Sequence, residues 1–202
     1  MAKIVTVSFR LEGKKPLLMN PMGDEAREDI EKGRTSVKAK LTAKELAATR
    51  VIRDPEGRPC LRADHLYECL VCAGREVQWK GLKMITPSKP GQPSKVYSFL
   101  ELEQEFFPLQ NGTPGATPAY AVDKRATPTD TGKRTISIRP RFDLPWAIEG
   151  TVKIDTTDIG LAKAREVFVR AGRMFGLGSY RGRYGLFRLA SWEIVKSEEV
   201  ED

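Results

Sequence analysis

Apolar and polar residues alternate with a period of two in several stretches of the chain. In VTVSFRL, at residues 5–11, every second residue is apolar. The stretch WAIEGTVKI at 146–154 shows the same alternation, and we also expect strands at RTISIRPRF (134–142) and at YGLFRLASWEIV (184–195). Alternation of this kind predicts strands with one face buried in a core.

Two other stretches have the apolar spacing of a helix. In the first, apolar residues recur at i, i+3, i+4 and i+7, and we expect Asp64 to cap this helix and Gly74 to end it. Its buried stripe consists of Leu66, Cys69, Leu70 and Ala73. The second helix is predicted from Ile159 to about Met174, started by Asp155 or Asp158.

Charged and loop-forming segments separate these elements. Residues 24–50 form a charged loop or insertion with little apolar periodicity, although Thr42 and Glu45 have the spacing of a capping box and predict a short helix there. Residues 83–132 are rich in proline, glycine, threonine and serine, which predicts long loops or a thumb-like hairpin. The elements that remain predict a single α+β domain, with a ferredoxin-like (RRM-like) βαββαβ core and long insertions.

Basic residues outnumber acidic ones, and they gather in two segments. The formal net charge is +7, from 34 Lys and Arg against 27 Asp and Glu. Residues 161–190 hold seven basic residues against one acidic residue, and residues 124–141 hold six against one. This distribution favours a polyanionic partner. No apolar run approaches the roughly 20 residues that cross a bilayer, and no signal-peptide pattern is visible, so we expect a cytoplasmic protein with no membrane partner.

The segment GLGSYRGRYGLFRL, at residues 176–189, places four glycines among arginines and tyrosines. It lacks the third glycine of a dinucleotide-binding loop and follows a predicted helix, so it meets the negative end of the helix dipole. A nucleotide-cofactor loop is therefore excluded. Arginine binds phosphate with a planar fork of donors, and tyrosine stacks on bases, so this composition favours a nucleic acid. The alternative is a glycine-rich turn with solvated arginines.

With the second basic segment, the loop gives a set of candidate nucleic-acid contacts from two parts of the chain. The loop contributes Gly176, Gly178, Tyr180, Arg181, Arg183, Tyr184 and Arg188, and the segment at 133–141 contributes Lys133, Arg134, Arg139 and Arg141.

Residues that could carry catalysis or a metal are few. Cys60, Cys69, Cys72 and His65 lie within 13 residues, but Cys69 falls on the apolar helix stripe, so we interpret the cysteines as reduced core thiols and expect no metal or other cofactor. His65, the only histidine, is expected to be exposed in the first turn of the helix. Asp24 lies in the charged loop, which we interpret as a solvated segment.

The segment GRPCLRADHLYECL at 57–70, together with the closing helix and its glycine loop, resembles the RAMP superfamily (repeat-associated mysterious proteins) of CRISPR systems. The hallmark of that family is a glycine–hydrophobic–glycine motif, about five residues including Lys or Arg, and a second glycine motif. Residues 176–178 match the opening, and Arg181 and Arg183 supply the basic residues. Six residues stand before the second motif, and Phe187 replaces its last glycine. The ending also resembles that of uncharacterised phage and prophage proteins.

The RAMP resemblance implies a subunit that binds the backbone of a guide RNA and associates with copies of itself or with other subunits. Residues 83–132 would supply the thumb that such subunits place between nucleotides. Some members cleave target RNA through an acidic residue after the first strand, for which Asp24 is the nearest candidate. Others process guide precursors with a histidine, for which His65 is the candidate.

We therefore expect a non-catalytic subunit of a ribonucleoprotein assembly that binds single-stranded RNA, with single-stranded DNA as the alternative ligand. Three other functions stay open. The chain could be a phage single-strand-binding protein, a ribonuclease that uses Asp24 or His65 with or without a metal, or an interaction subunit for an acidic protein.

Overall fold

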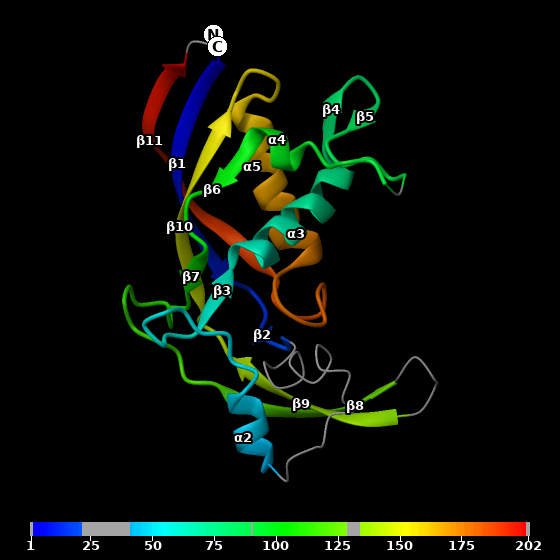
Figure 1. Ribbon diagram of the computed structural model, residues 1–202, viewed down its shortest axis with the longest axis vertical. Helices are drawn as coiled ribbons and strands as arrows, with labels where there is room; N and C mark the ends of the chain where they lie inside the picture. Colours follow the sequence, from blue (N-terminus) through cyan, green and yellow to red (C-terminus); the bar gives the residue numbers. More distant parts are fainter. Residues whose placement is uncertain (1, 22–40, 90, 129–133, 201–202) are drawn as a thin grey trace, which may run out of the picture.

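A four-stranded antiparallel sheet forms the larger part of the molecule (Figure 1). The computed structural model describes residues 2–21, 41–89, 91–128 and 134–200. The strands lie side by side in the order β11, β1, β10, β6. Their bounds are β1 (Ala2–Gly13), β6 (Leu100–Leu102), β10 (Ala147–Asp155) and β11 (Phe187–Val200).

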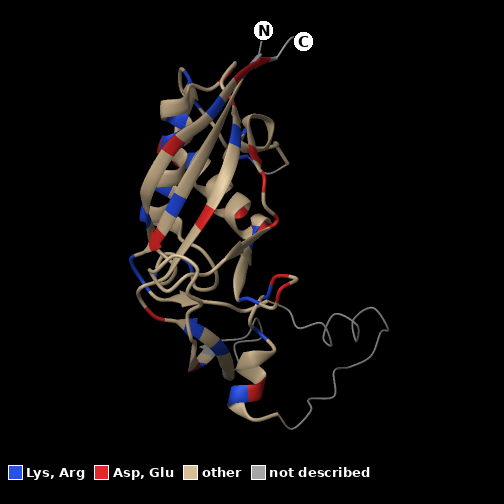
Figure 2. Cartoon of the chain, turned by 90° about the vertical axis from the view of Figure 1, so that its left-hand side faces the viewer, with Lys and Arg blue, Asp and Glu red and all other residues tan. Residues whose placement is uncertain are grey.

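The alternation of residues along β1 places its apolar side chains on one face of this sheet. Val5, Val7, Phe9 and Leu11 are all buried, as predicted, and Val7 lies opposite Val152 on β10. The other face carries charge: Arg10 donates to Glu12 at 3.0 Å and to Gln110 at 2.9 Å. Figure 2 shows basic and acidic residues, as blue and red segments, along the strands of this sheet.

Two helices cover the apolar face of the sheet (Figure 1). Helix α3 (Ala63–Ala73) lies between β1 and β6 in the chain, and α5 (Leu161–Arg170) lies between β10 and β11. Counting these six elements alone, the chain follows the order β1, α3, β6, β10, α5, β11. The prediction of an α+β fold is confirmed.

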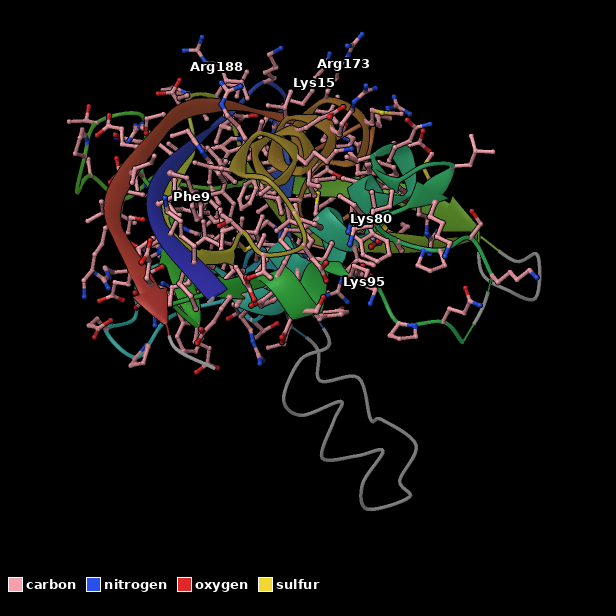
Figure 3. All side chains as sticks on the ribbon, turned by 90° about the horizontal axis from the view of Figure 1, so that it is seen from above. Phe9, Lys15, Lys80, Lys95, Arg173 and Arg188 are labelled. Atoms are coloured by element: carbon pink, nitrogen blue, oxygen red, sulfur yellow. The ribbon has the colours of Figure 1, made fainter. Side chains whose placement is uncertain are left out.

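Aromatic side chains fill the layer between the sheet and the helices. The ring of Phe168 on α5 lies 5.2 Å from that of Phe9 and 5.0 Å from that of Trp192. Figure 3 shows Phe9 between the sheet and the helices. Gly150, which faces Phe9 across the sheet, makes room for these rings, because a Cβ there would lie 2.4 Å from the ring of Phe107.

The predicted helices exist, but their first residues differ from the prediction. Helix α3 begins after Arg62, and Asp64 is not its cap but forms an ion pair with Arg62 at 3.2 Å. Helix α5 begins after Gly160, with no side-chain cap. Asp158 instead pairs with Lys80 at 2.8 Å, and Asp155 accepts a hydrogen bond from the Thr157 amide at 2.9 Å.

The C-terminal ends of both helices also differ from simple caps. Gly74 follows α3 and begins a 3-10 turn (Gly74–Glu76). Its backbone is right-handed, so glycine is not required there for a left-handed cap. A Cβ at this position would lie 2.4 Å from the Thr86 hydroxyl, which explains the glycine by packing. Helix α5 continues into one π turn (Ala171–Phe175), which leads directly into the glycine loop.

A second, three-stranded sheet lies at one end of the molecule, at the bottom of Figure 1. It joins β2 (Leu17–Leu18), β9 (Arg134–Phe142) and β8 (Ala121–Pro128) in that order. Helix α2 (Ala43–Ala48) packs against it, and the predicted capping box is confirmed: the Glu45 amide donates to the Thr42 hydroxyl at 3.3 Å.

Short elements complete the described chain. Part of the segment 83–132 belongs to the central sheet, since it contains β6. The remaining elements are β3 (Cys60–Arg62) paired with β7 (Phe106–Pro108), β4 (Gln78–Lys80) paired with β5 (Lys83–Met84), and α4 (Val96–Phe99).

Candidate nucleic-acid interface

The glycine loop, residues 176–186, has a backbone conformation that residues other than glycine rarely adopt. The φ angles are +77° at Gly176, +74° at Gly178 and +68° at Gly185, all in the left-handed region that favours glycine. Tyr180 also has a positive φ, of 53°. The loop therefore has a defined shape that the sequence encodes through its glycines.

Strand β2 and the residue before it, Pro16, hold this loop in place. The amide of Ser179 donates to the Leu18 carbonyl at 2.7 Å, and that of Gly185 donates to the Pro16 carbonyl at 2.9 Å. A Cβ at Gly178 would lie 2.3 Å from the Leu18 oxygen. Close packing against β2 thus explains why residue 178 is a glycine, with no need for a ligand. The contact of Gly178 with a nucleic acid stays a prediction.

The two basic segments singled out in the sequence meet at this loop. The Arg125 guanidinium, on β8, lies 4.5 Å from the ring centroid of Tyr184. The Arg139 guanidinium, on β9, lies 4.4 Å from that of Tyr180. We refer to these four residues, with Arg50 and Arg141 beside them, as the arginine–tyrosine cluster.

Asp123 neutralises part of this positive charge. Its carboxylate accepts two hydrogen bonds from Arg125, at 2.6 and 2.7 Å, and lies 3.9 Å from Arg141. The hydrogen bonds from Arg125 lower the pKa of Asp123 and raise the pKa of Arg125. Arg141 also pairs with Asp143 at 2.9 Å, so two of the arginines have carboxylate partners.

Arg139 has no such partner among the described residues. Only 9% of its surface is exposed, and its Nε and Nη1 atoms are buried without a hydrogen-bond acceptor. Arg50 adds a second positive charge nearby: it donates to the Ile138 carbonyl at 2.6 Å, and burial, followed by repulsion from Arg139, lowers its pKa. The centre of the cluster therefore carries a positive charge that Asp123 offsets only at a distance, without an ion pair among the described residues.

The other predicted contacts are distributed around the loop. Arg181 pairs with Glu68 on α3 at 3.2 Å, and Arg183 is exposed and forms no ion pair within the described chain. Arg188 pairs with Glu12 at 2.7 Å. Figure 3 shows Arg188 pointing outward on the same side of the molecule as Lys15 and Arg173.

Two predicted positions cannot be placed fully. Lys133 lies outside the described residues, and Arg134 is described only through its backbone in β9. The structure thus brings Tyr180, Tyr184, Arg139 and Arg141 together, from two distant segments.

Sequence reasoning missed Arg50, Arg125 and Asp123 as members of the site. A local signal existed for the last two, because Asp123 and Arg125 are separated by one residue and therefore share a face of β8. No local signal marked Arg50, which reaches the site from the segment after α2.

His65 is not the exposed residue that the sequence suggested. It is half-buried at the start of α3, where its Nδ1 accepts a hydrogen bond from the Arg62 amide at 3.4 Å. Burial, followed by repulsion from Arg62, lowers the pKa of the ring. Asp24, the other catalytic candidate, lies outside the described residues.

The prediction of buried core thiols is confirmed for two of the three cysteines, since Cys72 is half-buried. Cys60 and Cys69 are fully buried, and burial raises their thiol pKa values to about 11 and about 12. Within the described parts of the chain, no three His, Cys, Asp or Glu side chains are grouped closely enough to hold a metal ion. None of the described helices has the length and apolar character needed to span a membrane.

Comparisons with known proteins show similarity in structure alone. No family model and no curated protein matches the sequence. Among solved structures, a chain from the cryo-EM structure of the Type III-B Cmr-beta bound to cognate target RNA matches with a TM-score of 0.56 and 11% identity. The match covers 96% of this chain and 61% of that one, so the protein spans less than two thirds of its neighbour's length. The two chains share a fold.

Proposed function

We propose that this protein binds single-stranded RNA through the arginine–tyrosine cluster, as a non-catalytic subunit of a CRISPR-type ribonucleoprotein. The observation that carries the proposal is Arg139, a nearly buried guanidinium with two donors that lack acceptors among the described residues. Burying a charge without a partner is unfavourable, and an anion at this position would offset it. The phosphates of a nucleic-acid backbone supply such anions.

The tyrosines of the cluster favour a single strand over a duplex. Arg139 stacks on one face of Tyr180, and 41% of the tyrosine surface remains exposed. An exposed aromatic ring beside paired and unpaired arginines combines the two features of single-strand binding, stacking and backbone neutralisation. Exposed Arg183 extends the positive surface along the same loop.

The structural neighbour supports membership of an assembly. It comes from a Type III-B Cmr-beta complex bound to cognate target RNA. A shared fold, a basic surface and the glycine-loop motif together favour an equivalent role, with other subunits or further copies of this chain as partners.

The geometry of His65 supports a binding role over a catalytic one. Because Nδ1 accepts a hydrogen bond from the Arg62 amide, the neutral ring carries its hydrogen on Nε2. Nε2 is then a donor and not a free base, whereas a histidine ribonuclease needs a basic nitrogen that reaches the substrate hydroxyl.

Fluorescence anisotropy with labelled oligouridine tests the proposal. We expect Tyr180→Leu to weaken binding about 5- to 150-fold, since one stacked base contributes about 1–3 kcal/mol. Tyr97→Leu is the matched control, because Tyr97 is also exposed but lies on α4. Absence of RNA binding by the wild-type protein, or equal effects of the two variants, would overturn the proposal. Equal or tighter binding of single-stranded DNA would favour the phage single-strand-binding alternative.

A further inference from the structure

A small cavity lies directly beside the arginine–tyrosine cluster and is not explained by phosphate binding. Its volume is about 100 Å³, several times the space that one water molecule needs. Met19, Ile52 and Leu61 form an apolar wall, and Asn20, His65 and Ser179 contribute polar groups. Polar groups thus make up about half of the lining, and polar groups held in fixed positions are what orient a ligand in a binding site.

The cavity and the cluster have no residue in common, but a chain neighbour and a hydrogen bond connect them. Ser179 immediately precedes Tyr180, whose ring lies under Arg139. Asn20 accepts a hydrogen bond at 3.2 Å from Arg50 Nη1, the atom that also donates to Ile138 on β9. A nucleotide whose phosphate contacts the arginines would therefore have its sugar within reach of the cavity.

The polar groups of the cavity suit a hydroxyl ligand. His65 Nε2 carries the hydrogen of the neutral ring and donates, while Ser179 Oγ can donate or accept. Neither atom has a hydrogen-bond partner within the described chain. Burial lowers the pKa of His65, which keeps the ring neutral at physiological pH and offers a dipole instead of a second phosphate-binding charge.

We propose that this cavity binds the ribose edge of one bound nucleotide through its 2′-hydroxyl, and so makes the interface selective for RNA over DNA. The 2′-hydroxyl is both a donor and an acceptor and is the group by which proteins tell the two nucleic acids apart. This inference rests on the proposed function, because it requires the phosphates to lie on the neighbouring arginines.

Competition among three probes tests the inference: oligouridine, oligodeoxyuridine and 2′-O-methyl oligouridine of equal length. We expect the wild-type protein to prefer oligouridine about tenfold over each of the others, the factor that corresponds to about 1.4 kcal/mol of hydrogen bonding. His65→Leu, which fills the space without a donor, should bring all three affinities close together. His65→Gln, which keeps a donor near the position of Nε2, should retain the preference.

Ser179→Ala gives a second variant should His65→Leu fail to fold, and Ser197→Ala, on the exposed part of β11, is its matched control. A preference for RNA that survives His65→Leu or Ser179→Ala would overturn the assignment of the cavity. Equal binding of RNA and DNA by the wild-type protein would also overturn it, while leaving the single-strand-binding proposal intact. Failure of the wild-type protein to bind any probe would refute the proposed function itself.

Discussion

Replacing Arg139 with methionine should strengthen the fold and weaken RNA binding. Substitution of a residue that only supports the fold lowers both stability and RNA affinity, or changes neither. A gain in stability together with a loss of RNA affinity therefore identifies a functional residue. Methionine has a similar length and fills the same space, but it carries no charge and no donors. The substitution therefore removes the two buried nitrogens that lack acceptors.

The magnitude follows from the contacts of Arg139. Each buried donor without a partner destabilises the fold by about 1–3 kcal/mol, so Nε and Nη1 together cost about 2–6 kcal/mol, whereas the stacking of the guanidinium on Tyr180, at 4.4 Å, stabilises the fold by about 0.5–2 kcal/mol. Removing the two donors and the stacking together should raise the free energy of unfolding by roughly 3 kcal/mol. Loss of charge-assisted hydrogen bonds to phosphate, about 1.5–3 kcal/mol, should weaken RNA binding roughly 10- to 150-fold.

Urea unfolding and fluorescence anisotropy at several salt concentrations measure the two effects. The slope of log K against log salt should fall in magnitude by about 0.7, the value for one single-strand phosphate contact. Arg75→Met is the matched control, because Arg75 is exposed on the 3-10 turn after α3 and its loss changes the net charge equally. Loss of stability in Arg139→Met with unchanged RNA affinity would refute the reasoning.

Three further predictions follow from the described residues. Gly185 has a left-handed backbone, and the Cβ of an alanine there would lie 1.9 Å from a backbone oxygen. Gly185→Ala should therefore lower the free energy of unfolding by about 1–3 kcal/mol more than Gly57→Ala, whose Cβ would contact nothing, and urea unfolding compares the two variants. The lowered pKa of Asp123 means that its stabilisation is complete above the unfolded pKa, about 3.9, and is lost as pH falls through the folded value. Melting temperatures between pH 5 and pH 3 should therefore fall less steeply in Asp123→Asn than in the wild type. Labelled RNA incubated with the protein should stay intact with Mg²⁺ or EDTA on denaturing gels, and cleavage that disappears in His65→Ala or Asp24→Ala would show an enzyme instead.

The central fold was predictable because its signals are local. A period of two marked β1 and β10, and the stripe from Leu66 to Ala73 marked α3, since burial of one face imposes these spacings. The caps were less predictable, because Asp64 and Asp158 had other partners available, in Arg62 and Lys80.

Some residues of the candidate site could be predicted from the sequence, but the contacts between them could not. Composition pointed to Arg139 and Tyr180 separately. Their contact depends on β2, a strand of two residues that pairs with β9 and also binds the glycine loop, and so short a strand has no recognisable periodicity. The environment of His65 was missed for the same reason, because the cavity wall includes Ile52 and Gly178 from distant segments.

The bridging position of β2 has a consequence for the energetics of recognition. Leu17 and Leu18 are fully buried, and their backbone joins the loop that carries the tyrosines to the hairpin that carries the arginines. The conformational entropy of ordering those side chains is therefore lost when the protein folds and not when the ligand arrives. Under the proposed function, a preorganised surface of this kind would bind a short stretch of RNA with little rearrangement of the protein.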